Sequence, residues 1–588
     1  MMQELAGLRR DAAAWVGARL GEGRADHVMR LIVAVVVLLF PAACLLVSRS
    51  DSFSLFLLLV IGLVSWARAG FRTGFSRREW WYVGVFFLFF LAGVLAFELG
   101  QQTDYGFRLL GRYIRLLLVF PALIAFRRYR PPAMLVWMSL GLGALVLGVD
   151  AVWERLDIKG FLQPDGDTNV AILFGDLATL TTLAFAAGYM YVDARLPKLG
   201  PKLMWLGIVA GFIACFLSGA RGAWLAVPVL LALFLLCRHL LRPRSVLLGG
   251  TVVVVLFGIL YVLPQTKVQE RLDNGLEQLR TYSYVKQSLR DAPAPLCIDD
   301  PVLLKAWLSA GTRSHDRKLH ISIAPASAKP VHDLIASGCT RGMDLELVNQ
   351  SDHSNNLYLP RAIREGHGPA TLNFMAKGTG RVDFGQGPHS RAALHLKRFR
   401  KQELSTFPRL GDRLSLQVPA HASFRLVPLE LYTGEYRYAI LQSSVGQRLE
   451  MWAVAWRLFL QAPFTGVGTG AYMASAQRLV DAGLAPPVTS IYDHPHDEVL
   501  DALSSRGLLG LLALLLLFGV PGWLFAKGLN SPDPGRMGAS LAGLMVVVGM
   551  VMCGISETML VHSITLSWYV IMTAMFMVAA EQTEERGA

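Results

Sequence analysis

One short segment of the sequence combines two imidazoles with three carboxylates. It reads Asp493-His-Pro-His-Asp-Glu498 and precedes a long apolar stretch that opens with Gly507-Leu-Leu-Gly510. A neutral imidazole can accept a proton near neutral pH, which makes His496 a candidate general base for a hydroxyl group. The neighbours close enough in sequence to orient or polarise it are Asp493, His494, Asp497 and Glu498. The competing interpretation is that these side chains only cap and solvate a helix.

Two arginines stand where apolar segments are expected to meet water. Arg221 lies in the turn Ser218-Gly-Ala-Arg-Gly222 between two apolar stretches and has no acidic neighbour, while Arg448 lies near the start of an amphipathic helix. Guanidinium groups bind phosphate bidentately, so both are candidates for holding an anionic lipid head group. Each could instead be a snorkelling or surface arginine. Arg112 and Arg115, one turn apart in another apolar stretch, are explained about as well by interfacial anchoring as by function.

Arginines and a histidine at a membrane surface predict transfer of a sugar from a lipid pyrophosphate. The arginines would neutralise the charge that develops on the leaving pyrophosphate, and the histidine would deprotonate the incoming hydroxyl. We expect no ATP and no other cofactor, because the pyrophosphate already activates the sugar. We also expect no metal, since the remaining histidines are scattered and no Cys/His pair has metal-ligand spacing.

The composition is that of a membrane protein. The 588 residues are 53% hydrophobic and 17% charged, whereas soluble domains carry about 25% charged residues. The apolar residues gather in runs long enough to cross about 30 Å of hydrocarbon. We therefore expect an all-α polytopic membrane protein of about twelve transmembrane helices with a β-rich extracytoplasmic insertion. The expected spans are 29–48, 53–69, 80–99, 108–126, 132–150, 169–192, 203–219, 221–237, 246–264, 507–528, 537–556 and 559–580.

The basic residues set the orientation of these spans. The net charge is +13, but the arginines and lysines lie in short alternate loops, so membrane orientation explains them and nucleic acid is not an expected partner. Positively charged loops stay in the cytoplasm. Both termini are therefore expected inside, and the residues after the ninth span outside. The loops expected inside contain Arg68 to Arg78, Arg127 to Arg130, Arg195 to Lys202 and Arg238 to Arg244.

The long stretch between the ninth and tenth spans must contain folded structure. Short alternating runs such as 319–323, 344–348, 371–375, 413–418 and 424–431 predict strands of an antiparallel domain. Cys297 and Cys339 lie in this region and would pair in an oxidising compartment. Gly466-Val-Gly-Thr-Gly470 is interpreted as a turn and not a phosphate loop. The expected domains are 1–264 (spans one to nine), 265–290 (helical), 291–440 (β-rich insertion), 441–506 (helical catalytic segment) and 507–588 (spans ten to twelve).

At these residues the chain resembles the O-antigen ligase superfamily of bacterial envelope glycosyltransferases. That superfamily includes lipopolysaccharide O-antigen ligases, Wzy-type polymerases and some protein oligosaccharyltransferases. The resemblance is carried by the arginine turn at 218–222, by Ser444-Val-Gly-Gln-Arg-Leu-Glu-Met-Trp452, by Pro463 with its following glycines, and by His-Asp at 496–497 with Gly-Leu-Leu-Gly nine residues later.

The resemblance implies metal-independent transfer of a glycan from undecaprenyl pyrophosphate at the periplasmic face of the bacterial inner membrane. Arg221 and Arg448 would contact the pyrophosphate, and His496 would activate the acceptor. The partners implied are the lipid-linked glycan, lipid A-core as acceptor, and membrane lipids; a growing polymer or a protein is the alternative acceptor. Two features depart from the family pattern: Asp497 stands where Asn is frequent, and the insertion at 291–440 is additional.

Functions of other classes are also open. Twelve spans suit a transporter, but no inverted repeat and no pair of Gly/Pro-broken spans is evident. A sensor that binds a ligand through its β domain is a third possibility, although no cytoplasmic signalling domain accompanies it.

Overall fold

The computed structural model describes residues 24–156, 170–236 and 444–581 nearly without interruption, the strands between residues 319 and 432, and a few isolated positions elsewhere. Its contacts divide the chain into two compact units. The first comprises Met1–Gln269, Val454–Ala476 and Tyr492–Ala588, and the second comprises Glu270–Ala453 and Gln477–Ile491. The predicted domain boundaries stay predictions, and the expected helical segment 265–290 lies almost wholly outside the described residues.

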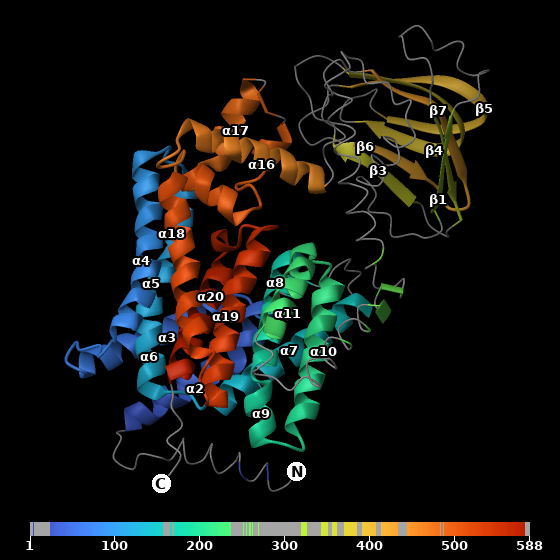
Figure 1. Ribbon diagram of the computed structural model, residues 1–588. Helices are drawn as coiled ribbons and strands as arrows, with labels where there is room; N and C mark the ends of the chain where they lie inside the picture. Colours follow the sequence, from blue (N-terminus) through green and yellow to red (C-terminus); the bar gives the residue numbers. More distant parts are fainter. Residues whose placement is uncertain are drawn as a thin grey trace. The chain divides into compact units, whose positions relative to one another are not determined.

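The first unit is a bundle of long apolar helices (Figure 1). Its helices are α2 (Arg24–Leu46), α3 (Ser50–Arg68), α4 (Arg77–Leu99), α5 (Asp104–Leu117), α6 (Val119–Tyr129), α7 (Ala133–Leu156), α8 (Ala171–Ala187), α9 (Tyr189–Arg195), α10 (Gly200–Ser218), α11 (Arg221–Leu236), α18 (Glu498–Gly528), α19 (Pro534–Gly554), η6 (Met559–Val561) and α20 (Ser563–Glu581). The helices α16 (Ser444–Gln461) and α17 (Tyr472–Asp481) have residues in both units, and η5 (Pro487–Ser490) belongs to the second unit.

Many of these helices can cross a bilayer. Among the described residues nine are long and apolar enough, counting α5 and α6 as one, and α8 with α9, bent by 49°, is either a broken tenth span or a re-entrant loop. A shorter apolar helix covers Gly222–Phe234. The predicted span 246–264 falls mostly outside the described residues, so the count of twelve stays a prediction. The structure supports a multi-pass membrane protein that is mostly helical.

Local sequence explains where the helices begin. Ser76 and Glu79 form a capping box at the start of α4, and the Thr103 hydroxyl accepts from Gly106 N at the start of α5. With its 23 residues, α4 is about 34 Å long, enough for the hydrocarbon layer. Through their broad apolar surfaces, α18 packs against α4 and α19, and α20 packs against α19 and α6.

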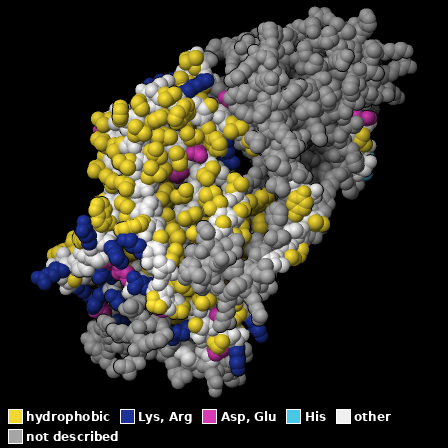
Figure 2. Space-filling model, in the orientation of Figure 1, with side chains coloured by type: hydrophobic (Ala, Val, Ile, Leu, Met, Phe, Trp, Pro, Cys, Tyr) yellow, Lys and Arg dark blue, Asp and Glu magenta, His cyan; other side chains and the backbone are white. Residues whose placement is uncertain are grey.

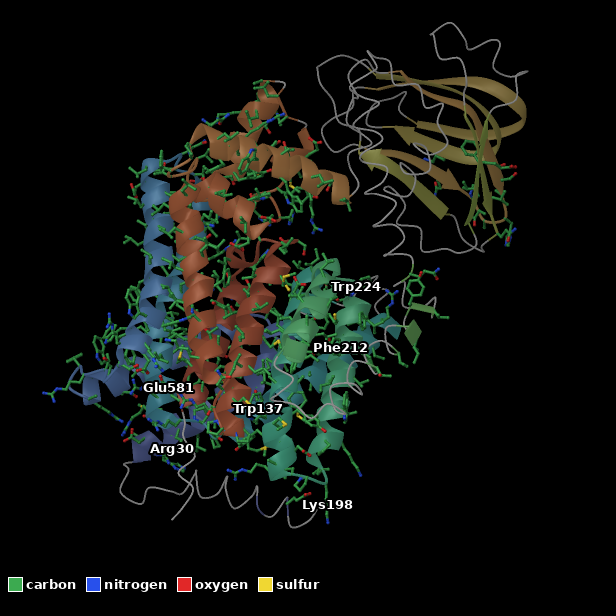
Figure 3. All side chains as sticks on the ribbon, viewed as in Figure 1. Arg30, Trp137, Lys198, Phe212, Trp224 and Glu581 are labelled. Carbon is green, nitrogen blue, oxygen red and sulfur yellow. The ribbon has the colours of Figure 1, made fainter. Side chains whose placement is uncertain are left out.

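One end of the bundle is basic. Figure 3 places Arg30, Lys198 and Glu581 toward that end, near which α2 begins and α20 ends. Figure 2 shows dark-blue Lys and Arg side chains gathered there below a largely hydrophobic band. Arginines in the last turns of α3 and α6 form ion pairs, Arg68 with Asp26 at 3.0 Å and Arg127 with Glu79 at 2.6 Å. The connections α4–α5, α10–α11 and α19–η6 lie at the opposite ends of their helices.

The second unit contains a seven-stranded antiparallel sheet. Its strands are β1 (Leu319–Pro325), β2 (Met343–Asn349), β3 (Asn355–Arg361), β4 (Ala370–Phe384), β5 (Arg391–Thr406), β6 (Arg413–Val418) and β7 (Ser423–Tyr432). The order is β1-β2-β7-β4-β6-β3, and β5 pairs with β4. The five predicted strand segments lie in β1, β2, β4, β6 and β7, while β3 and β5 were not predicted. The full extent of the insertion stays a prediction, and Cys297 and Cys339 lie outside the described residues.

Candidate functional site

The predicted base, His496, stands one residue before the cap of α18. Asp497 is that cap, and its Oδ1 accepts a hydrogen bond of 2.8 Å from Leu500 N. His496 itself has a positive φ of 54°, a backbone conformation that costs energy for a residue with a side chain. Its ring contacts the Tyr492 ring edge-on, with centroids 5.0 Å apart. The imidazole therefore lies in the turn that precedes α18, in contact with Tyr492.

The carboxylate that contacts His496 comes from another part of the chain. Glu557 lies between α19 and η6, 61 residues after His496, and its Oε1 is 2.8 Å from His496 Nδ1. The same oxygen lies 3.2 Å from His494 Nε2 and 3.8 Å from His562 Nε2. It also accepts from Thr558 N at 3.0 Å. We call His494, His496, His562 and Glu557 the His–Glu cluster.

The electrostatics of the cluster fix the protonation of Glu557. Burial alone would raise the pKa of Glu557, but its contacts with the imidazoles of His494, His496 and His562 outweigh burial and hold that pKa well below its usual range. An ionised carboxylate only accepts hydrogen bonds, so His496 Nδ1 must carry the proton in their contact. In the neutral imidazole the lone pair then lies on Nε2. His496 is partly open, with 18% of its side chain exposed, whereas Glu557 has 3%.

This arrangement is that of a base held by a buried acid. The carboxylate fixes the tautomer and stabilises the imidazolium that forms when Nε2 takes a proton. Nε2 is free to face a hydroxyl group because Nδ1 supplies the structural contact. The cluster can therefore remove a proton from an incoming alcohol.

The cluster also has the donor types of a metal site. Among the described residues, His494, His496 and Glu557 bring one donor atom each within 4.8 Å of one another. However, both imidazoles direct a nitrogen at the same carboxylate oxygen at hydrogen-bond distance. Metal ligation would instead need deprotonated nitrogens directed at the ion. The geometry favours proton transfer, and the expectation that no metal is involved stays a prediction.

Buried polar contacts anchor the cluster to the bundle. Glu498, the first residue of α18, accepts from Leu560 N through Oε2 at 2.9 Å and so holds η6 against α18. Two turns further on, the fully buried Arg506 donates to Asp501 Oδ2 at 3.1 Å and to the Tyr113 hydroxyl at 2.5 Å. The guanidinium also lies over the Phe89 ring, 5.0 Å from its centroid. These contacts join α4, α5 and α18 beneath the cluster.

The glycine-rich loop after Pro463 completes a break in α18, and its interpretation as a turn is confirmed. Gly507 has φ 63° and ψ −155°, which interrupts the helix. The carbonyls of Ser504 and Ser505 accept instead from Val467 N at 2.9 Å and Gly468 N at 3.1 Å. Beyond the break, Leu508 N donates to the carbonyl of Pro463 at 2.8 Å. The loop thus satisfies the backbone groups that the break exposes.

Arg221 begins α11 immediately after a tight turn. Gly219 ends α10 in the left-handed conformation, with φ 67°, and Trp224 Nε1 donates to the carbonyl of Cys215 across the turn at 3.3 Å. The neighbouring Gly222 packs against the side chain of Ser556, which precedes Glu557. The first turn of α11 therefore lies beside the loop that carries Glu557. The side chain of Arg221 is outside the described residues.

The other predicted residues are divided between the two units. Arg448 is half-buried in α16 and belongs to the second unit, so its expected place beside His496 stays a prediction. His494 lies within the His–Glu cluster. Asp497 caps α18, and Glu498 holds Leu560. Asp493 is half-buried and lies within electrostatic range of the Tyr105 hydroxyl.

Two members of the cluster, Glu557 and His562, were not predicted. A signal for Glu557 was present: it is an acidic residue in the very short connection between two apolar stretches, in Ser556-Glu-Thr558. The expectation that a charge at membrane depth has a function applies to it as it does to Arg221. His562 follows the same connection.

Comparison with known proteins identifies a family resemblance in the segment that carries His496. Residues 430–515 match the family model described as O-antigen ligase, a segment that includes Arg448, His496 and the break at Gly507. An uncharacterised protein of Haemophilus influenzae is 20% identical over 257 residues, which cover 42% of this chain and 62% of that protein. The match supports an O-antigen ligase-like or polymerase-like membrane enzyme. The predicted resemblance to the O-antigen ligase superfamily is thereby confirmed.

Proposed function

We propose that the chain transfers a glycan from undecaprenyl pyrophosphate to a sugar hydroxyl of lipid A-core, at the periplasmic face of a bacterial inner membrane. The observation that carries the proposal is the contact between His496 Nδ1 and the buried Glu557 carboxylate, which leaves Nε2 as a base. The O-antigen ligase match covers the histidine. The donor, the acceptor and the compartment are parts of the proposal.

The reaction follows from these groups. The acceptor hydroxyl transfers its proton to His496 Nε2 as its oxygen attacks the anomeric carbon of the donor sugar. The bond from that carbon to the pyrophosphate oxygen breaks, and undecaprenyl pyrophosphate leaves with the electron pair. Glu557 stabilises the imidazolium. Arg221 and Arg448 neutralise the charge on the leaving group, the electrostatic contribution that is usually largest.

The same donor chemistry serves two other acceptors. A Wzy-type polymerase would transfer the glycan to another lipid-linked repeat, and a protein oligosaccharyltransferase to a protein hydroxyl. We favour the ligase because the segment around Arg448 is closest to that branch and the matching family model is described as O-antigen ligase. The three differ only in which acceptor gains glycan.

The test uses purified full-length protein in lipid nanodiscs with a polyprenyl-pyrophosphate glycan. Lipid A-core, a second lipid-linked repeat and a peptide are offered separately, and the acceptor that gains glycan is scored. His496→Ala should lower the transfer rate by about 10²–10⁴-fold with donor binding nearly intact. The matched control is His27→Ala, an exposed histidine at the basic end of α2, which should transfer at the wild-type rate.

Two results would contradict the proposal. Transfer by His496→Ala at the wild-type rate would make the histidine structural. Loss of activity in EDTA, with recovery on adding Zn²⁺, would turn the His–Glu cluster into a metal site. Activity that is unchanged by EDTA supports the proton-transfer role.

A further inference from the structure

Two of the three arginines of α5, Arg112 and Arg115, make different contacts. Arg115 donates to the Ser52 hydroxyl at 3.0 Å and lies within electrostatic range of the buried Asp51. Arg112 donates through Nη1 to the carbonyl of Val561 at 2.8 Å and lies 5.7 Å from the centroid of the Tyr105 ring. Within the part of the chain that the structure describes, no carboxylate lies within ion-pair distance of Arg112. Among the described residues, Arg115 thus has a carboxylate nearby, and Arg112 has none at ion-pair distance.

The contact with Val561 places Arg112 at the His–Glu cluster. Val561 is the last residue of η6 and is followed by His562, whose Nε2 lies 3.8 Å from Glu557. A guanidinium has five N–H donors in a planar fork, and the Val561 carbonyl occupies one of its edges. Arg112 is half-buried, and the Tyr105 side chain is a second hydrogen-bond partner beside the Val561 carbonyl. The N–H groups that these two partners leave open can receive an anion.

The depth of Arg112 indicates what kind of anion this is. Arg112 lies eight residues after the start of α5 at Asp104, which is about 12 Å along the helix. Arg112 thus lies within the candidate membrane span Asp104–Tyr129, where a cation is costly unless an anion joins it. A free phosphate would have to leave water to reach it, whereas the head group of a membrane lipid brings its phosphates close to this depth with its chain in the bilayer.

We propose that Arg112 is a further diphosphate-binding residue for the lipid-linked donor. This inference rests on the proposed function. The Val561 carbonyl holds one edge of the guanidinium, and its open N–H groups bind the diphosphate next to the base. A charge-assisted contact of this kind strengthens as negative charge grows on the leaving group. Arg115 stays a structural residue that is paired with α3.

The experiment measures donor binding apart from transfer. Polyprenyl diphosphate without sugar is added to nanodiscs that contain wild-type, Arg112→Gln or Arg112→Lys protein, and affinity is read by native mass spectrometry. Arg112→Gln should bind about ten- to a hundredfold more weakly, and Arg112→Lys should lose less because it keeps the charge without the fork. The matched control is Arg108→Gln, an exposed arginine one turn earlier on α5, which should bind as the wild type does.

Kinetic measurements distinguish binding of the donor diphosphate at Arg112 from binding of the phosphate groups of the acceptor. Arg112→Gln should raise the KM for the donor and leave the KM for lipid A-core, which also carries phosphates, unchanged. Polyprenyl diphosphate without sugar should inhibit the wild type in competition with the donor and inhibit Arg112→Gln less, and inorganic pyrophosphate should inhibit both weakly. A raised KM for the acceptor, or competition of polyprenyl diphosphate with the acceptor, overturns the assignment to the donor.

The outcomes separate this inference from the proposed function. If the wild type does not bind polyprenyl diphosphate at all, the proposed function fails. If the wild type binds and transfers while Arg112→Gln and Arg112→Lys bind equally well, only the role of Arg112 fails. Should Arg112→Gln not fold, Arg112→Lys decides: a severalfold weaker affinity supports the role and an unchanged affinity overturns it.

Discussion

A single buried oxygen, Oε1 of Glu557, accepts from two imidazoles and a backbone N–H. Such convergence keeps the carboxylate ionised, because each donor favours the charged form. It also fixes the ring of His496, which could otherwise rotate or change tautomer. At the residue scale the candidate site is therefore a histidine whose ring is held by a carboxylate from a distant part of the chain.

Glu557→Gln should lower kcat with little change in the donor KM, because an amide cannot stabilise the imidazolium as a carboxylate does. The loss should be smaller than that of His496→Ala, about 10- to 100-fold. Steady-state kinetics in nanodiscs check this, with Glu98→Gln, an exposed residue of α4, as the control. A Glu557→Gln variant with wild-type kcat would show that the contact is not used in catalysis.

The depressed pKa of Glu557 also predicts how stability depends on pH. A carboxyl whose folded-state pKa is below its unfolded value of about 4.3 contributes stability above that value and loses it as pH falls through the folded-state pKa. The thermal midpoint of the wild type should therefore fall more steeply than that of Glu557→Gln as the pH is lowered below about 5. Parallel curves for the two proteins would contradict the depressed pKa.

At the scale of elements, the break in α18 joins two separate sequence motifs, the glycine-rich loop after Pro463 and the segment Gly507-Leu-Leu-Gly510. A Cβ at Gly507 would collide with the backbone of Phe464, and the positive φ would be strained for any other residue. Gly507→Ala should therefore destabilise the protein by about 1–3 kcal/mol or more. The control on the same helix is Gly519→Ala, where nothing lies within 4 Å of the new methyl. Thermal unfolding in detergent measures both, and equal midpoints would show that the break is not required.

Local patterns predicted most elements, and the exceptions have physical reasons. Apolar runs gave the helices of the bundle, and alternation gave five strands. The strands missed, β3 and β5, each pair with a single neighbour. Such edge strands tolerate proline and charge, and Pro360 in β3 and the run Lys397 to Lys401 in β5 interrupt the apolar alternation. The strand β1 also has a single neighbour, but it keeps its apolar alternation over 319–323 and was predicted.

The part of the candidate site that is contiguous in the sequence was predicted. His494 and His496 were identified because their neighbours in sequence are also chemically active. Glu557 was not, because two transmembrane helices separate it from His496 and only their packing brings the two together. The difference between Arg112 and Arg115 likewise depends on partners in other helices, Val561 and Ser52.

At the scale of the whole membrane unit, the distribution of charge decides which compartment the His–Glu cluster faces. The cluster lies where α18 begins and α19 ends, opposite to the basic connections α3–α4 and α6–α7. Loops rich in Lys and Arg stay in the cytoplasm. This orientation would place the cluster in the periplasm, where a glycan carried on a lipid would meet its acceptor.

Cysteine labelling on intact cells tests this orientation. Arg72 and Gln102 are exposed residues in the connections at opposite ends of α4. With a membrane-impermeant thiol reagent, Gln102→Cys should react and Arg72→Cys should react only after the membrane is permeabilised, because the reagent cannot cross the bilayer. The parent chain, with its own six cysteines, gives the background that both variants must exceed. Reaction of Arg72→Cys alone on intact cells would invert the topology, place His496 in the cytoplasm and rule out a periplasmic acceptor.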